Sequence, residues 1–287
     1  MELIESKVEL IEQGPGLAGI YKQIELAGRT CYKSEDKITE DSAKEFVDRM
    51  IKLGHGAMLE HGTVYLKVPK TDTAYIIGVR YEKNKYSKSI YVSGDWYITT
   101  NLRVLVENGW LDDLQYICEP TEFHEKRITV KFVCDRGVSH EYVRHRVFSF
   151  AQESTRYCNY SKDKFGNELT FIHPSWSLAK MHEEDHKGDR FIDTLYEIEK
   201  QYFYLIENGW KPQQAGQILP NALKTEIVVT GFESDWKRFL DLRTSGAAHP
   251  DMRKLALELK DLMYGCNEEQ DSDTESSRTD SDALATA

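Results

Sequence analysis

The sequence predicts a globular protein of the α+β class, and three observations lead to that prediction. Its 287 residues, 40% of them apolar, are enough for a substantial core. Residues Ile128–Cys134 alternate between apolar and other side chains, as a strand with one buried face does. Residues Asp189–Asn208 repeat apolar side chains at helical spacing, and Gly209 ends the pattern. Strong signals of both kinds indicate a domain that mixes strands and helices.

The other elements follow from the same two periodicities, with Gly, Pro and capping residues marking their ends. Further strands are expected over Glu2–Glu12, Thr63–Val68 and Phe171–His173, and a hairpin around Asn84-Lys85 over Tyr75–Tyr81 and Ser89–Tyr97. Helices are expected over Leu17–Ala27, Ala43–Leu53, Thr100–Asn108, Gln213–Leu219, Asp235–Leu242 and Pro250–Tyr264. Another helix is expected to start at Gly137 or Ser139, and Glu226–Thr230 fits either a strand or a helix.

Composition limits the partners and the location. No run of 18 apolar residues occurs, so no membrane span or membrane partner is expected. The acidic, alternating N-terminal segment differs from a secretory signal, and five scattered cysteines without a CxxC pair suggest reduced thiols and a cytoplasmic protein. The net charge of −11 argues against nucleic acid as a partner.

The C-terminal residues differ in composition from the rest. Residues 267–287 hold seven acids, one arginine, one leucine and no aromatic residue. Such a segment cannot bury a core, so residues 266–287 are expected to be a disordered acidic tail. Residues 1–265 are expected to form a single domain.

The stretch Glu141–Tyr160 carries the strongest chemical signal. Arg144, His145 and Arg146 are consecutive, and Ser154 and Arg156 follow within ten residues. The planar guanidinium group of arginine can donate two parallel hydrogen bonds to the oxygens of one phosphate, so the pattern suggests a polyanion site. The alternative is a solvated basic helix face or a set of ion pairs. Interleaved apolar residues suggest partial burial instead, and the nearby acids, chiefly Glu141 and Glu153, are too few to pair every arginine.

Other motifs are weaker. No metal site is expected: His140-Glu141 lacks a histidine four residues on, and His55 and His61 lack a third ligand. Ser154 has no nucleophile elbow, so a hydroxyl donor to a phosphate or sugar is the better interpretation. Arg243, followed by His249, forms a second cluster near the C-terminus; the alternative is a cation that pairs with the helix dipole.

Taken together, these segments resemble one family. Arg144-His145-Arg146, seven residues and then Ser154 match the RHR-x7-S signature of flavin-dependent thymidylate synthases. Gly54-His55 with Glu60-His61, Leu219-Pro220-Asn221 and the ending with Arg243 and His249 resemble the family in the same order. The resemblance covers residues 40–265 apart from an insert over 70–125. It implies an antiparallel sheet flanked by helices, in a homotetramer with active sites between subunits.

The resemblance also implies an activity, which is methylation of dUMP to dTMP with methylenetetrahydrofolate as carbon donor and NADPH as reductant of bound FAD. It implies FAD contacts by His55, Glu60, Arg144, His145, Arg146 and His249. It implies dUMP contacts by Glu141, Gln152, Glu153, Ser154, Arg156, Lys224 and Arg243. Arg243 would contact the uracil ring, where a cation stabilises developing charge. We expect Arg144–Arg146 on a helix and Gln152–Arg156 on the loop after it.

The sequence departs from the family at two places. Glu226 stands where many members carry an arginine for dUMP, and we hypothesise that Lys224 or another basic residue replaces that contact. The residues near Phe232 and Ser234, where polar FAD contacts are expected, are also altered. The rival interpretation is therefore a flavin- or nucleotide-binding protein of the same fold without turnover.

Overall fold

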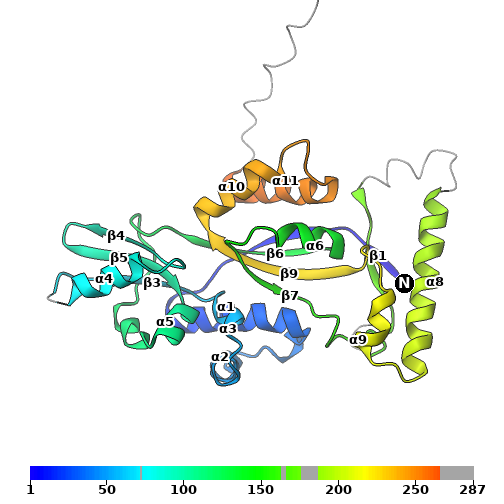
Figure 1. Cartoon of the computed structure of the whole chain (residues 1–287), viewed down its shortest axis with the longest axis horizontal. Coiled ribbons are helices and arrows are strands. Elements are labelled where there is room, and N and C mark those ends of the chain that lie inside the picture. The colour runs from blue at the N-terminus through cyan, green and yellow to red at the C-terminus, as the bar shows by residue number, and fades with distance from the viewer. Residues whose placement is uncertain (72, 163–165, 176–186, 266–287) are drawn as a thin grey trace, which may run out of the picture.

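The computed structural model describes residues 1–71, 73–162, 166–175 and 187–265. A central sheet lies between two layers of helices, with a smaller sheet at one end and a long helix at the other (Figure 1). The predicted mixture of helices with antiparallel sheets is therefore confirmed. The predicted tail lies outside the described residues.

The central sheet has four strands in the order β2-β6-β9-β7, and every neighbouring pair is antiparallel. They are β2 (Lys7–Ile11), β6 (Arg127–Asp135), β9 (Lys224–Phe232) and β7 (Ser149–Gln152). The strand predicted at Ile128–Cys134 is confirmed, and the ambiguous segment Glu226–Thr230 is part of β9. Side chains on a strand alternate between its faces, so each of these strands contributes to both sides of the sheet.

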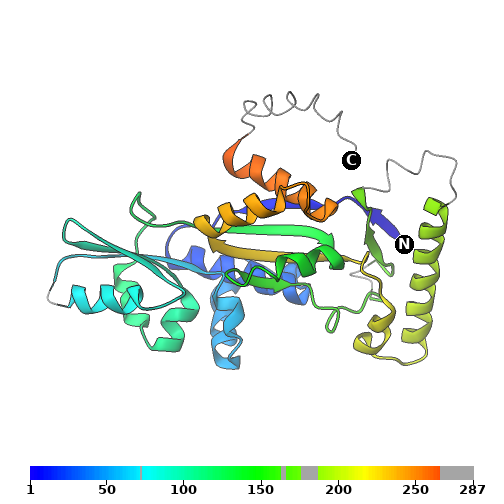
Figure 2. The ribbon, with the colours of Figure 1, turned by 45° about the horizontal axis from the view of Figure 1, so that its top comes forward.

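Helices cover both faces of this sheet (Figures 1 and 2). Above it, as drawn, lie α6 (Arg136–Tyr142), α10 (Glu233–Arg243) and α11 (Pro250–Tyr264). Below it lie α1 (Gly16–Tyr32), α2 (Ser42–Leu53) and α3 (Gly56–Leu59). We call these the upper and lower faces. The predicted helices at Leu17–Ala27, Ala43–Leu53, Asp235–Leu242 and Pro250–Tyr264 are confirmed.

Aromatic side chains fill the upper face. Phe132 of β6 lies 4.3 Å, between ring centroids, from Tyr142 of α6, and Trp236 of α10 is fully buried beside it. Phe148 lies 4.5 Å from Trp236 by the same measure. Large buried rings each remove much apolar surface from water, so this core fixes α6 and α10 on the sheet.

On the lower face, α1 is longer than the sequence predicts. The end expected near Gly28 is wrong, because Gly28 lies inside the helix at a close crossing with α2. A Cβ on Gly28 would stand 2.4 Å from the Phe46 ring, so glycine serves the packing there. The helix ends instead at Lys33, whose φ of 47° is in the left-handed region.

The segment predicted as an insert forms a lobe at the left of Figure 1. The strand before it, β3 (Thr63–Val68), lies where it is predicted and joins β5 (Asp95–Asn101) and β4 (Lys88–Val92) of the lobe in a sheet of order β3-β5-β4. A short helix, α5 (Leu102–Asn108), and a 3-10 helix, η2 (Leu111–Tyr116), follow β5.

The first strand predicted in this lobe is wrong. Residues 74–82 form helix α4 (Ala74–Glu82). Its buried residues, Ala74, Ile77, Gly78 and Tyr81, have helical spacing, which outweighs the strand-like composition. The hairpin consists of β4 and β5 and turns at Ser93 and Gly94, both at positive φ, rather than at Asn84-Lys85.

The opposite end of the molecule consists of a short sheet and further helices. β1 (Glu2–Ile4) pairs in parallel with β8 (Thr170–Ile172), and α8 (Lys187–Glu207) and α9 (Pro212–Ala215) pack nearby (Figure 1). A 3-10 turn, η4 (Gly216–Ile218), follows α9, and another, η1 (Glu35–Lys37), follows α1. The single strand predicted over Glu2–Glu12 is wrong, since β1 and β2 belong to different sheets. Within the described residues, no helix combines the length and apolarity needed to cross a bilayer.

Candidate active site

The Arg144-His145-Arg146 segment lies just beyond α6. Asp135 caps that helix by accepting a hydrogen bond from the backbone N–H of Val138 at 2.8 Å. The helix ends at Tyr142, its last buried residue, so the prediction that the three basic residues lie on a helix is wrong. Val143 and Val147 are 44% and 62% exposed, and without apolar burial the helix is not continued.

Arg243, at the end of α10, joins this segment to α6. Its Nε donates to His145 Nε2 at 2.9 Å, and its Nη1 and Nη2 donate to the Glu141 carboxylate and carbonyl at 2.8 and 3.1 Å. Glu141 also pairs with Arg144 at 2.9 Å. We call these four residues the Arg243 cluster. Sequence positions about 100 apart are therefore brought together.

The cluster fixes the charge state of its histidine. Burial and the neighbouring Arg243 cation lower the pKa of His145 below the ordinary histidine value. The ring is neutral at pH 7 and accepts the guanidinium hydrogen bond. Arg243 has five N–H groups, and the three hydrogen bonds leave two without an acceptor in the described part of the chain. Those two donors are available to a ligand.

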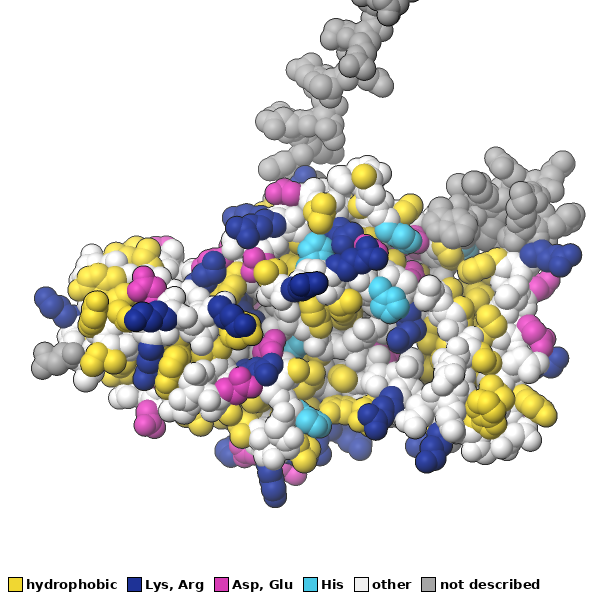
Figure 3. All heavy atoms as spheres, viewed as in Figure 1, with side chains coloured by type: hydrophobic (Ala, Val, Ile, Leu, Met, Phe, Trp, Pro, Cys, Tyr) yellow, Lys and Arg dark blue, Asp and Glu magenta, His cyan; other side chains and the backbone are white. Residues whose placement is uncertain are grey.

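The two arginines of the segment point to solvent. The Arg144 side chain is 68% exposed despite its ion pair with Glu141, and Arg146 is exposed without an ion pair among the described residues. Lys, Arg and His side chains gather over α6 and α10 on this face (Figure 3). The expectation of partial burial is wrong for both arginines, which are instead placed to meet an external anion.

Strand β7 lies inside the seven-residue spacer between Arg146 and Ser154. Gln152 is the last residue of β7 rather than a loop residue, so that prediction is wrong. Its side-chain amide donates to Ser139 Oγ at 2.9 Å and to Thr225 Oγ1 at 3.2 Å, which places it on the upper face beside α6.

The next residue, Glu153, lies on the lower face. Its carboxylate accepts a hydrogen bond from Tyr160, and Lys224 lies 3.1 Å away. Lys224 also lies 2.5 Å from Glu226. Lys33 and Lys131 bind Glu226 as well, the second at 2.7 Å. These five charged residues, Lys33, Lys131, Lys224, Glu153 and Glu226, are called the lysine–glutamate cluster.

Mutual pairing keeps this cluster ionised. Burial by itself would raise the pKa of Glu226, but Lys224, Lys33 and Lys131 together hold it well below the ordinary value. Burial likewise opposes charge on Lys33, and Glu226 overcomes that effect and raises the lysine pKa. All members of the cluster that show shifted pKa values are thus charged at pH 7.

Ser154 and Arg156 belong to the loop that follows Glu153 on the lower face. The backbone N–H of Ser154 donates to the carbonyl of Cys31, at the end of α1, at 3.1 Å. Arg156 is exposed and lies over the Tyr157 ring, which packs against Tyr32. The Tyr32 hydroxyl is 3.1 Å from His55 Nδ1. The predicted FAD ligand His55 therefore lies with the predicted dUMP ligands and not with Arg144–Arg146.

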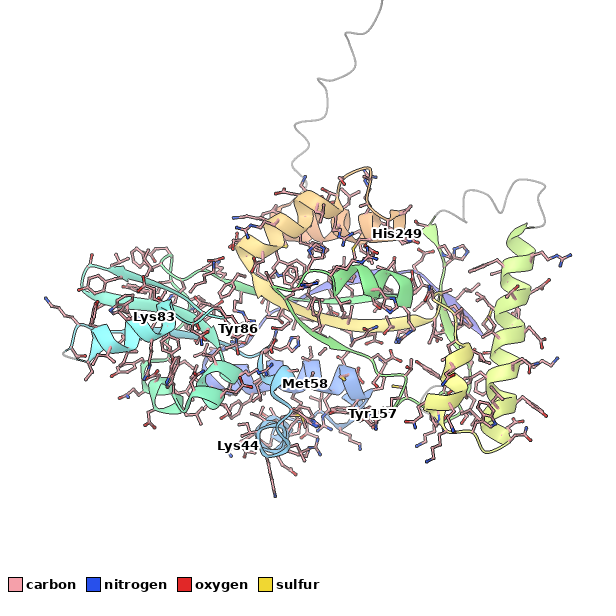
Figure 4. All side chains as sticks on the ribbon, in the orientation of Figure 1. Lys44, Met58, Lys83, Tyr86, Tyr157 and His249 are labelled. Atoms are coloured by element: carbon pink, nitrogen blue, oxygen red, sulfur yellow. The ribbon has the colours of Figure 1, made fainter. Side chains whose placement is uncertain are left out.

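Two further predicted residues lie apart from both clusters. Glu60 pairs with Arg103 of α5 at 2.5 Å, so its carboxylate faces the insert lobe. His249 is exposed at the start of α11 on the upper face, whereas Tyr157 lies below the sheet (Figure 4).

A cavity of about 660 Å³ lies elsewhere, between the exit of β2, the start of α1 and the end of α11. It is lined by none of the predicted site residues. The predicted residues instead lie on two surfaces of one chain, above and below the sheet.

Sequence reasoning missed Lys33 and Lys131. The three lysines of the cluster are about 95 residues apart in sequence, and no local motif links them. The pairing of β6 with β9, which places Lys131 opposite Val228, brings Lys131 to the Glu226 carboxylate, and the packing of the end of α1 on the sheet brings Lys33 there. Finding these two residues would have required the strand register and the tertiary placement of α1.

Comparison with known proteins identifies a family. The family model of the thymidylate synthase complementing protein matches residues 108–265. The chain is 26% identical over 242 residues to a flavin-dependent thymidylate synthase of Corynebacterium aurimucosum, covering 82% of this chain and 72% of that protein.

Two other relatives carry the same name. The protein of Corynebacterium glutamicum is 24% identical over 255 residues, covering 86% of this chain and 77% of the relative. That of Sulfolobus acidocaldarius is 33% identical over 127 residues, covering 44% of this chain and 45% of the relative. The matched range contains the Arg243 cluster, β7 and β9. The chain belongs to the thymidylate synthase complementing protein family, that of the flavin-dependent thymidylate synthases.

Proposed function

We propose that this protein is a thymidylate synthase that methylates dUMP to dTMP, with methylenetetrahydrofolate as carbon donor and NADPH as reductant of bound FAD. The observation that carries the proposal is the Arg243 cluster. It presents an oriented guanidinium with two N–H donors that no described residue accepts, next to a neutral imidazole and two exposed arginines. Such a site suits an anionic cofactor and a polar heterocycle.

The chain's own residues fit the binding of FAD and dUMP. Arg144 and Arg146 would hold the FAD pyrophosphate, because both guanidiniums are exposed and Arg146 has no ion pair in the described residues. His55 and His249 are exposed at helix starts and could reach the same cofactor from other subunits. Ser154, Arg156 and Gln152 would hold dUMP. When bound, FAD supplies the hydride that completes the methyl group.

Arg243 would act on the pyrimidine. Its two remaining N–H groups can donate to a uracil carbonyl and stabilise negative charge that develops there. Glu141 and His145 fix the guanidinium plane, so its orientation is set before the substrate arrives. Because the ring is activated electrostatically, the reaction needs no nucleophile from the protein, which suits a site without a Cys-His or Ser-His pair.

A homotetramer with active sites between subunits would join the two surfaces. Arg144, Arg146, Gln152 and Arg243 lie on the upper face, and Ser154, Arg156 and His55 lie on the lower. Because the sheet separates the two surfaces, one chain cannot bring both of them to the same FAD and dUMP molecules. We propose a single catalytic domain over 1–265 with 70–125 as an insert, in a cytoplasmic enzyme; the free thiols of the described cysteines are compatible with that location.

A second candidate is a flavin- or nucleotide-binding protein without turnover. Glu226 favours it, because a carboxylate stands where the resemblance implies an arginine for dUMP. The three lysines around that carboxylate favour the synthase, since they restore positive charge to the same place.

The deciding experiment is dTMP formation by the purified protein from dUMP, methylenetetrahydrofolate and NADPH. Arg243→Ala is expected to lower kcat by about 100-fold or more, because a donor to developing charge is lost. Its flavin absorbance should remain. Arg238→Ala, an exposed arginine on the same helix, is the matched control and should retain activity. A wild-type protein that binds flavin but forms no dTMP would support the second candidate instead.

A further inference from the structure

The cavity of about 660 Å³ beside the start of α1 lies where the central sheet meets the sheet β3-β5-β4 (Figure 1). Thr63 and Tyr65 of β3 contribute to its lining, as do residues 126–129 at the start of β6. Apolar side chains form much of the wall, among them Leu10, Ile11, Ile20, Ile117, Ile128 and Met263. A space of this volume can hold a small organic molecule, and its wall suits an apolar body.

Arg127, the first residue of β6, brings a positive charge to the cavity. Its Nη1 donates to the carbonyl of Glu60 at 2.9 Å and to Thr63 Oγ1 at 3.4 Å. Both acceptors are neutral, and the Glu60 carboxylate pairs with Arg103 instead. Arg127 forms no ion pair with any residue that the structure describes, so its charge lacks a counter-ion there.

Burial makes the missing counter-ion unfavourable. Arg127 Nε is buried and has no hydrogen-bond partner in the described part of the chain. Desolvation lowers the pKa of Arg127 to about 10, although Tyr65, Glu60 and Asp235 oppose that shift. The guanidinium is still charged at pH 7, and a partly enclosed charge is stabilised by an anionic partner. Its Nη2 has no acceptor among the described residues either, so it can donate to such a partner.

The start of α1 adds a second source of positive potential. Gly14 and Gly16 line the cavity, and the helix begins at Gly16 with no side-chain cap and no acid in its first turn. Gly16 has a φ of 62°, and a Cβ on it would meet nothing within 4 Å, so open space lies beside the first turn. The N–H groups and the dipole of a helix start both favour a negatively charged group.

Acidic residues limit how much negative charge the cavity can accept. Glu12 and Glu119, both exposed, line it together with Glu233. Glu233 pairs with a lysine of α10 at 3.1 Å, whereas Glu12 and Glu119 have no ion pair among the described residues. These two carboxylates offset the charges of Lys126 and Arg127, which also line the cavity, and would repel a polyanion. A ligand with a single negative group fits this balance.

We infer that this cavity is a binding site for a small, singly charged organic acid with an apolar or aromatic body. The acid group pairs with Arg127 beside the start of α1, and the body packs against the apolar wall. The site is additional to the proposed synthase activity, because none of the residues assigned to FAD or dUMP line it.

The test uses full-length protein with excess FAD and dUMP, and measures the binding of naphthoate and of its uncharged analogue naphthamide by equilibrium dialysis. The wild type should bind naphthoate saturably and more tightly than either naphthamide or a naphthalene dicarboxylate. Arg127→Gln is expected to weaken naphthoate binding about tenfold or more, because the charge is lost, and to leave naphthamide binding unchanged. Retained naphthamide binding also shows that the variant keeps its fold.

Two further variants locate the site. Leu262 lines the cavity from α11 and is 52% exposed, so Leu262→Trp should fill the space without disturbing the core and weaken both probes. Arg238→Gln removes an exposed arginine of α10 that does not line the cavity, and it should bind both probes as the wild type does.

Three results would overturn the inference. The first is a wild type without saturable naphthoate binding. The second is unchanged naphthoate affinity in Arg127→Gln or in Leu262→Trp, which would put the bound molecule elsewhere. The third is an equal loss of naphthoate and naphthamide in Arg127→Gln, which would make Arg127 a structural link between β3 and β6 rather than a partner of the acid group.

Discussion

At the scale of single residues, His61 is the clearest case of a side chain that the folded protein keeps in its neutral form. It is fully buried, and its Nδ1 lies 2.8 Å from Thr230 Oγ1, which in turn bonds Thr129. Burial and the nearby Arg127 charge lower the pKa of His61 to about 3. The folded protein therefore requires a neutral ring there.

The lowered pKa of His61 predicts that the free energy of unfolding decreases as the pH falls below the ordinary histidine value. Between the ordinary pKa of 6.5 and about 3, the unfolded chain binds a proton that the folded chain rejects. The stabilising contribution is complete above pH 6.5 and decreases by about 1.4 kcal/mol for each unit below it. From pH 7.5 to pH 5.0 the wild type should lose roughly 2 kcal/mol more than His61→Gln, as measured by urea unfolding. Parallel losses in the two proteins would contradict the prediction.

The sequence singles out the members of the Arg243 cluster one by one, but it does not single out Lys33 and Lys131 of the lysine–glutamate cluster, for a physical reason. Arg144, His145 and Arg146 are adjacent, and their partner Arg243 ends an amphipathic helix, so local patterns point to them. Lys131 reaches Glu226 through the pairing of β6 with β9, and Lys33 reaches it through the packing of the end of α1; no local pattern specifies either contact.

At the scale of elements, β7 depends on a close approach to β9. A Cβ on Gly231 of β9 would stand 2.1 Å from Phe148 Cδ1. Phe148 packs on Trp236 in the upper core, and its ring centroid is 6.1 Å from that of His145. The missing side chain of Gly231 therefore leaves room for the Phe148 ring, which connects the upper core with His145 of the basic segment.

We predict that Gly231→Ala destabilises the protein by about 1–3 kcal/mol, because the enclosed Phe148 ring must move to admit the methyl group. Since that ring supports His145, kcat should also decrease. Chemical denaturation and dTMP formation measure the two effects. Gly216→Ala, whose added methyl group would meet only ordinary contacts, is the control and should be close to wild type in both. A fully stable and active Gly231→Ala would refute the coupling.

The elements also show where sequence patterns fail. Long periodic elements such as α8, α11 and β6 follow from the sequence, because their apolar residues repeat over many positions. The sequence predicts a strand where α4 lies and a helix that extends beyond the end of α6, since both helices are short and tertiary contacts decide their extent. The two site segments fall next to such short elements.

At the scale of the whole molecule, the two predicted ligand surfaces face away from each other across the sheet. If active sites form between subunits, inactive chains with defects on different faces should complement one another. We predict that Arg243→Ala and Arg156→Ala, each inactive alone, regain up to about a quarter of wild-type activity when co-expressed, since random mixing leaves that share of sites intact. The activity of the purified co-expressed protein reports this directly. Activity no higher than that of either variant alone would place both residues in sites built by one chain.

The Gln152 and Glu153 side chains project to opposite faces of the sheet, and this alternation limits the insertions and deletions that the sequence can tolerate in evolution. Because neighbouring strand residues project to opposite sides, one inserted or deleted residue within β7 would send the amide below the sheet and the carboxylate above it. The contacts of Gln152 with Ser139 and Thr225 and the place of Glu153 in the lysine–glutamate cluster would be lost in a single event. Natural variants should therefore keep the length between Arg146 and Ser154 while substituting its residues, and length polymorphism should be confined to segments such as the β4–β5 turn.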